Sequence, residues 1–131
     1  MRGFIGMFVL ALAGLSTNAY AFPAASTGPD FRGIENRLEG DSALAEGRTA
    51  VVGAIPPGTP VVTAEAILQD AGAQCKPKHN DAQTLRCIYN DVRIGDGSID
   101  HVQWHTLLYT AGGKVVSLSV NRDVDRHPTQ D

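Results

Sequence analysis

Two histidines, His101 and His105, are the first residues whose type and spacing suggest chemistry, because imidazole is a common metal ligand. On a helix, a spacing of four places both side chains on one face, where they can chelate one zinc ion. The residues around them alternate between apolar and polar types, however, which is typical of a strand. A strand rises about 3.3 Å per residue and holds two such histidines about 13 Å apart, too far for one ion. We therefore expect no metal site and no cofactor, and both histidines to face solvent or a partner.

The segment 96–100 has the composition of a calcium-binding loop, with Asp96 and Asp100 at its ends. An EF-hand requires oxygen ligands at alternating positions over about twelve residues and a closing glutamate, and this segment has neither. Ser98 follows Gly97 but lacks the G-x-S-x-G context of a hydrolase nucleophile. Glycine and aspartate are ordinary turn residues. The segment therefore predicts a turn.

Two carboxylates, Glu35 and Glu39, stand four residues apart, which places them on one face of a helix. Such a pair can act as general acid and base, as in glycoside hydrolases. They lie in a segment that we expect to be poorly ordered, which favours a solvated helix face over a catalytic pair. No catalytic residue is assigned and we expect a protein that is not an enzyme. A small hydrolase stays open only because one sequence does not show which Ser, His and Asp meet in space.

Cys75 and Cys87 are the two cysteines of the chain, and they enclose residues 76–86. There is no C-x-x-C motif and no further Cys or His at zinc-finger spacing, so neither redox catalysis nor a zinc site fits. An even number of cysteines in an exported protein is typical of a disulfide. We expect a Cys75–Cys87 bond, which contributes about 3 kcal/mol in the chain-entropy model.

The amino terminus has the three parts of a secretory signal peptide. Arg2 is the only charge before an apolar run over residues 4–15, and Ala-Tyr-Ala at 19–21 forms an A-x-A cleavage pattern. The apolar run is shorter than the roughly 20 residues of a membrane-spanning helix. The next residue is Phe rather than the Cys that lipoproteins acylate. We expect cleavage near Ala21 and a mature chain that is periplasmic or secreted, without membrane insertion.

The charge balance limits the class of partner. The formal net charge is −3, and it becomes −4 when the predicted signal peptide with Arg2 is removed. Nucleic acids and anionic membrane surfaces require clustered Lys and Arg. The one basic patch, residues 76–79, is short and predicts a solvated loop. A protein partner is expected and nucleic acid is not, whereas the oligomeric state stays open.

Two helices are predicted from apolar periodicity and end signals. The first runs from Asp41, its N-cap, to about Ala54, and its apolar residues near one face are Leu44, Val51 and Val52. The second begins with Thr59 as N-cap and Pro60 in its first turn, and it ends at Gly72. Its apolar face is formed by Val61, Ala64, Ile67, Leu68 and Ala71.

Three strands follow, over residues 84–92, 101–109 and 114–122, with turns at 95–98 and 110–113. Alternation of residue type places Leu85, Cys87 and Tyr89 on one face of the first strand, and Val102, Trp104, Thr106 and Leu108 on one face of the second. In the third strand it predicts that Val116, Leu118 and Val120 point inward.

These elements predict an α+β fold with two helices packed on a three-stranded antiparallel β-meander and one disulfide. The expected organisation is a signal peptide at 1–21, a flexible N-terminal segment at 22–40, the α+β domain at 41–123 and a flexible tail at 124–131.

A family resemblance rests on motifs in a fixed order. They are Ile-Pro-Pro-Gly-Thr-Pro at 55–60, a helix that ends on Ala-Gly-Ala at 71–73, a Tyr-bearing strand, a Trp-bearing strand and Ala-Gly-Gly-Lys-Val-Val at 111–116. Over about residues 54–122 this order resembles the SmpA/OmlA (BamE-like) group of small envelope proteins. The resemblance implies an exported, non-enzymatic envelope or periplasmic binding protein.

The unit of two helices and three strands is also similar to the beta-lactamase inhibitor protein fold. That likeness implies the alternative function, a periplasmic inhibitor or immunity-type protein that blocks an enzyme. In either case the sheet face opposite the helices is the expected partner-binding surface. Its candidate residues are His101, His105 and Tyr109, with Trp104 as an anchor if it is exposed rather than packed in the core.

Overall fold

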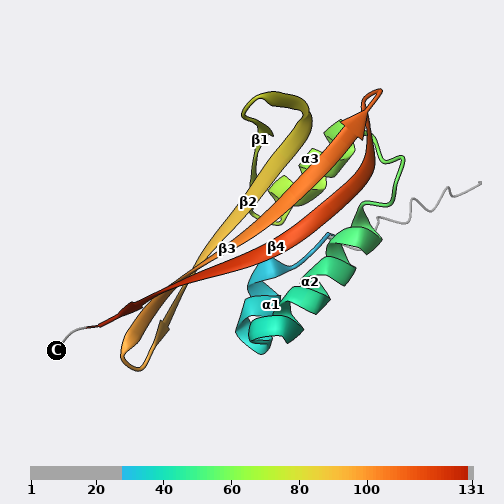
Figure 1. Cartoon of the computed structure of the whole chain (residues 1–131). Coiled ribbons are helices and arrows are strands. Elements are labelled where there is room, and N and C mark those ends of the chain that lie inside the picture. Colours follow the sequence, from blue (N-terminus) through green and yellow to red (C-terminus); the bar gives the residue numbers. More distant parts are fainter. Residues whose placement is uncertain (1–27, 130–131) are drawn as a thin grey trace, which may run out of the picture.

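The computed structural model describes residues 28–129, so the predicted signal peptide lies outside the described residues. Figure 1 shows three helices on one side of an antiparallel sheet whose strand order is β1-β2-β3-β4. The elements in chain order are α1 (Phe31–Arg37), α2 (Gly40–Ala54), α3 (Val61–Asp70), β1 (Gln74–Lys78), β2 (Asp81–Gly95), β3 (Ser98–Ala111) and β4 (Lys114–Pro128). Among these residues no helix has the length and apolar character needed to cross a bilayer.

The predicted set of two helices and three strands is wrong, because the fold has a third helix and a fourth strand. The additional helix, α1, lies in the segment 22–40 that was expected to be flexible. The Asp30 carboxylate caps it by accepting a 3.0 Å hydrogen bond from the Gly33 amide. Phe31 and Ile34, three residues apart, bury one face against the core. Packing of these two side chains, rather than a long periodic pattern, stabilises this short helix.

The additional strand, β1, replaces the solvated loop that was expected at residues 76–79. It contains Pro77 and polar residues, so its sequence shows no strand alternation. It forms because it pairs antiparallel with β2, with Cys75 directly opposite Cys87. The predicted Cys75–Cys87 disulfide is confirmed.

The strands are longer than predicted, and β4 includes most of the segment 124–131 that was expected to fray. Its pairing with β3 continues to Pro128, opposite Ser98. Figure 1 shows the β2–β3 hairpin and the carboxyl end of β4 extending together beyond the helices. Backbone pairing with β3 therefore orders a part of the chain that no helix covers.

The predicted inward position of Val116 is wrong, although Leu118 and Val120 face the core as expected. The register between β3 and β4 shifts between Tyr109 and Thr110, so Val116 is an extra residue in β4. Such a bulge reverses the alternation on its amino-terminal side. Val115 is consequently buried and Val116 is 53% exposed.

Helix α2 buries Ala43, Gly47 and Val51, whereas Val52, predicted on the same face, is 54% exposed. Gly47 lies against the Trp104 ring, where a Cβ would overlap the indole. A residue that weakens the helix by propensity therefore makes room for the largest side chain of the core.

Helix α3 begins one residue later than predicted, with Pro60 as N-cap. Thr59 does not cap it, because its hydroxyl donates to the Pro56 carbonyl at 2.6 Å. The predicted end at Gly72 is confirmed, since Gly72 has a φ of +95°. The Ala73 amide then bonds the Leu68 carbonyl at 2.9 Å, a glycine-dependent helix end.

Candidate binding face and the ion network behind it

One face of the sheet packs on the helices and the other is open (Figure 1). Alternate residues of each strand reach this open face. In β2 to β4 they include Arg86, Ile88, Asn90, Gln103, His105, Leu107, Tyr109, Ser119, Asn121 and Asp123. We call this set, with its β1 neighbours Gln74 and Lys76, the open face.

Charges on the open face separate by sign. Lys76 on β1 lies beside Arg86 on β2, so the β1–β2 side is basic. Asp123 and Asp125 on β4 make the opposite side acidic. The two rows are separated by β3, which carries only histidines, polar and apolar residues on this face. A surface of this kind favours a partner with the reverse charge arrangement.

A surface hollow of about 480 Å³ lies on the basic side of the open face. Half-buried Ile88 contributes its apolar part, whereas Lys76, Arg86, Asn90 and Gln103 supply polar groups. A hollow with one apolar wall and several polar groups suits a side chain of a partner protein.

His105 lies in a polar chain that crosses three strands. The Arg86 Nη2 donates to His105 Nδ1 at 3.1 Å, because a guanidinium has no acceptor. The Nε2 atom of the same ring lies 3.3 Å from the Asp123 carboxylate and 3.2 Å from the Gln103 side-chain Oε1. These contacts fix the orientation of the imidazole on the open face.

His101 has different neighbours. Its ring meets that of His127 edge-to-face, with centroids 5.4 Å apart, and His127 contacts Asp125 at 3.1 Å. His101 and His105 therefore contact different sets of side chains: His127 lies beside His101, whereas Arg86 and Asp123 lie beside His105. Within residues 28–129 no cluster of three His, Cys, Asp or Glu side chains could hold a metal ion.

Trp104 lies on the helix side of β3 and is completely buried, so it belongs to the core and not to the open face. Its ring packs against Phe31, with centroids 5.1 Å apart, and Phe31 also stacks on Tyr89 at 5.2 Å. Of the two aromatic candidates, only Tyr109 reaches solvent, at 38% exposure.

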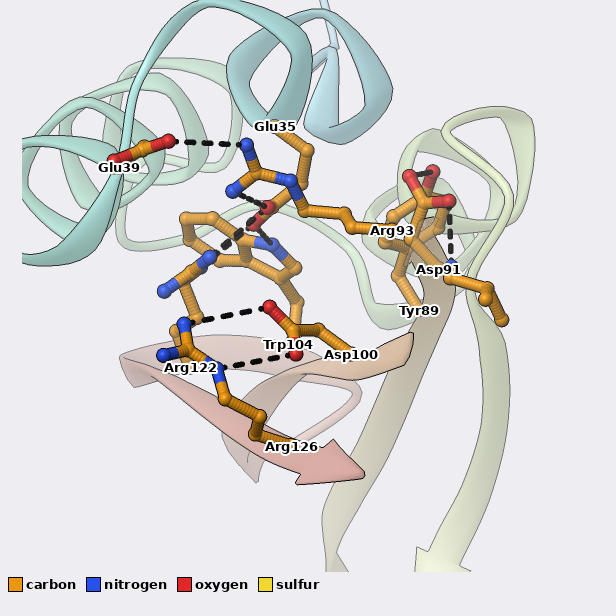
Figure 2. A network of polar contacts seen from close by, with 10 residues as sticks. Glu35, Glu39, Tyr89, Asp91, Arg93, Asp100, Trp104, Arg122 and Arg126 are labelled. Atoms are coloured by element: carbon orange, nitrogen blue, oxygen red, sulfur yellow. Dashed lines mark hydrogen bonds and ion pairs between the residues drawn. The ribbon is translucent and has the colours of Figure 1, made fainter. Parts of the chain in front are cut away.

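Behind the sheet, Glu35 is the centre of a buried ion network (Figure 2). Its carboxylate accepts hydrogen bonds from Trp104 Nε1 at 2.7 Å, Arg122 Nε at 2.6 Å and Arg122 Nη2 at 2.9 Å. Arg93 Nη1 lies 3.7 Å away. The expectation of a solvated helix face is therefore wrong for Glu35, which is 1% exposed. Glu39 is solvated, with a side chain that is 85% exposed, but it lies between α1 and α2 and not on a helix face.

The network balances its charges. The bidentate contact with Glu35 raises the pKa of Arg122, so this guanidinium stays charged. Arg93 bridges to Glu39, its Nη2 lying 3.4 Å from the carboxylate. Both oxygens of the buried carboxylate accept hydrogen bonds from Trp104 or Arg122, so Glu35 faces these core donors rather than solvent or a surface hollow.

Two further contacts extend this polar layer along the projecting part of the sheet (Figure 2). Arg126 Nε contacts Asp100 at 3.2 Å across β3 and β4. The Tyr89 hydroxyl donates to Asp91 at 2.9 Å, and burial together with this carboxylate raises the pKa of Tyr89 to about 12.

Sequence reasoning missed the roles of Arg93 and Arg122 altogether. Glu35 is 69 residues from Trp104 and 87 residues from Arg122 in the chain, so no local spacing relates them. One signal was available: Glu35 directly follows Ile34 and stands four residues after Phe31, so it lies beside the apolar side of a short helix and must either reach solvent or meet a partner.

The comparisons with known proteins find nothing. No family model, no curated protein and no solved structure matches this chain. The SmpA/OmlA resemblance therefore stays a prediction from the motifs, and the function has to be argued from the geometry.

Proposed function

We propose that this chain is an exported, non-enzymatic binding protein of the BamE-like type, and that its open face binds a protein partner. The observation that carries this proposal is the arrangement of layers: all three helices pack on one side of the sheet. The other side presents a basic edge, an apolar and aromatic middle, and an acidic edge.

The rigidity of the sheet supports the proposal. The Cys75–Cys87 disulfide joins β1 to β2, and the Glu35 network joins α1 to β3 and β4. A surface held in one shape loses little conformational entropy on binding, so even a modest number of contacts gives useful affinity.

The middle of the open face supplies the apolar contact that a protein interface needs. Ile88 and Leu107 are half-buried and Tyr109 is exposed, and all three lie between the charged edges. Interfaces typically combine such an aromatic and aliphatic centre with a polar rim.

The test is capture of partners from a periplasmic extract by the purified chain and by matched variants. Arg86→Glu and Leu107→Ser change the open face, whereas Val62→Ser and Val52→Ser change exposed valines of α3 and α2. The fluorescence of the buried Trp104 reports whether each variant is folded.

A partner retained by the helix variants and lost by both open-face variants is the expected result. A partner lost only with the helix variants would place the binding surface on the other side. If the partner is an enzyme whose activity falls on binding, the inhibitor alternative replaces the envelope-assembly type.

A further inference from the structure

The outer edge of β4 is the second unpartnered feature of the fold. β4 is an edge strand of fifteen residues, whereas the opposite edge, β1, has only five and contains Pro77. Short edges with proline resist the addition of another strand, but a long edge presents rows of unpaired amides and carbonyls.

The amino-terminal half of this edge is already occupied. The Val115 amide and carbonyl bond Thr59 and Gly58 at 2.8 and 2.7 Å, so the α2–α3 connection pairs with β4 there. Farther along, Arg48 of α2 donates from Nε to the Val120 carbonyl at 3.1 Å. These contacts cover the edge at Val115 and at the Val120 carbonyl.

The hydrogen bond from Arg48 to the Val120 carbonyl shows which backbone groups of β4 point away from β3. In an antiparallel strand, the amide and carbonyl of one residue face the same side, and successive residues alternate. Because the Val120 carbonyl faces α2 and not β3, Arg122, Val124 and Arg126 also direct their amides and carbonyls outward. Within residues 28–129, no hydrogen bond reaches the outward groups of these three residues.

Two hollows flank this free part of the edge. One of about 420 Å³ lies on the helix side, where Val102 and Val124 form an apolar part among charged side chains, namely Glu39, Arg93, Asp100, Arg122 and Arg126. The other, of about 330 Å³, lies on the open-face side and is lined by Asp123, Val124 and Asp125 with His101 and Gln103. The side chains of a strand added to β4 would alternate between these two hollows.

A second copy of this chain is a poor occupant. Antiparallel pairing of β4 with itself about Val124 places Asp123 opposite Asp125 of the other copy, twice. A shift of two residues in either direction places Asp123 or Asp125 opposite itself. Like charges directly opposite each other destabilise a strand pair, so the acidic residues protect the edge against self-association.

We propose that residues 122–126 of β4 form a strand-addition site for an extended segment of a partner protein with the pattern basic–aliphatic–basic. The two basic residues face Asp123 and Asp125, and the aliphatic residue between them contacts Val124, which is 43% exposed. Backbone pairing supplies the affinity and the alternating side chains supply the specificity. This site shares Asp123 with the open face, but it is formed by the free backbone edge of β4, whereas the preceding proposal uses the middle of that face around Leu107 and Tyr109.

The probe is a blocked peptide of alternating Lys and Val, which presents all its lysines on one side of a strand. Its control has Glu in place of every Lys. Binding is followed through the backbone amide signals of the isotope-labelled chain. We expect the Lys peptide to shift the amides of Arg122, Val124 and Arg126, and the Glu peptide to bind at least tenfold more weakly.

The decisive variant is Val124→Pro. Its amide points outward, so proline removes no bond to β3 and is tolerated there as on other sheet edges. We expect at least tenfold weaker binding of the Lys peptide, with the Trp104 fluorescence unchanged. Should this variant unfold, Asp123→Asn with Asp125→Asn provides the second test and is expected to weaken binding several-fold.

Three results would overturn the proposal. One is equal binding to the wild type and to a folded Val124→Pro variant. Another is a set of amide shifts centred on Leu107 and Tyr109, which would move the peptide to the open face. The third is the absence of any shift at peptide concentrations in the millimolar range, the weakest affinity at which such a site is useful.

Discussion

The carboxylate of Glu35 lies 2.7 Å from the indole nitrogen of Trp104 and is buried with it. This contact links the first helix to the centre of β3, and Arg122 adds two charge-assisted bonds from β4. A buried carboxylate with several donors is costly to disturb, because removal of one donor leaves part of its charge without compensation. The most direct predictions concern this contact.

Arg122→Met is expected to lower the free energy of unfolding by about 3–5 kcal/mol, since it leaves the Glu35 charge buried beside Trp104. Arg122→Met with Glu35→Leu should cost less than the sum of the single variants, because the unpaired charge is then absent. Urea unfolding measures all of these. Arg37→Met, in an exposed pair with Glu46 at 2.9 Å, is the control and should cost at most about 1 kcal/mol. An equal loss of unfolding free energy in Arg37→Met and Arg122→Met would contradict the prediction that burial makes the Arg122–Glu35 pair costly to break.

Gly47→Ala is expected to destabilise the protein by about 1–3 kcal/mol, because the new Cβ would overlap the Trp104 ring. Gly53→Ala is the matched control in the same helix, where nothing lies within 4 Å of the added Cβ. There the change should stabilise by about 0.5–1 kcal/mol through helix propensity. Thermal unfolding of the two variants gives opposite shifts if Trp104 packs on Gly47 as described.

Tyr89 makes the free energy of unfolding depend on pH in the alkaline range. Its pKa is raised from an ordinary value of 10.0 to about 12, so the folded state favours the neutral phenol. The corresponding stability is fully present below pH 10 and is lost as the pH rises through 12. Unfolding by urea at a series of pH values should show this loss in the wild type and a smaller one in Tyr89→Phe. Equal losses in both proteins would assign the effect to other groups.

The disulfide is expected to contribute about 3 kcal/mol, mainly by restricting the unfolded chain. Unfolding with and without a reductant measures this difference. A Cys75→Ala, Cys87→Ala variant should match the reduced protein and respond no further to reductant. Hydrogen exchange should locate the loss at the β1–β2 pair, where the two cysteines are opposite each other.

Export is testable without any partner. Expression in a bacterium should yield a periplasmic or secreted product whose mass corresponds to loss of residues 1–21, as the A-x-A pattern predicts. Ala19→Leu with Ala21→Leu should block cleavage and leave the precursor. Recovery of the uncleaved wild-type chain from the cytoplasm would contradict the predicted signal peptide.

Local patterns were sufficient for much of this fold. Alternation over residues 101–109 correctly placed Val102, Trp104, Thr106 and Leu108 on one face, because side chains of a strand must point to alternate faces, and the structure shows that this face is buried. Gly72 correctly ended α3, since its positive φ is a property of a single residue. The two cysteines paired as expected, because no other cysteine was available in the chain.

Other features depended on residues far apart in the chain, and local patterns did not contain them. β1 is a strand because β2 pairs with it, and α1 is held by contacts with distant residues, among them the packing of Phe31 on Tyr89 and Trp104. One extra residue, Val116, was enough to reverse the inward and outward positions at the start of β4.

The sequence by itself determined the features whose signals are local: the strand faces away from the bulge at Val116, the carboxyl ends of α2 and α3, and the disulfide. Only the tertiary structure decided that Glu35 is buried and that Trp104 is its donor, because that contact joins residues 69 positions apart. It also decided which side of the sheet and which half of β4 stay uncovered. The physical reason is that alternation and capping depend on residues a few positions apart, whereas burial and strand pairing depend on residues that are distant in the chain and adjacent in the fold.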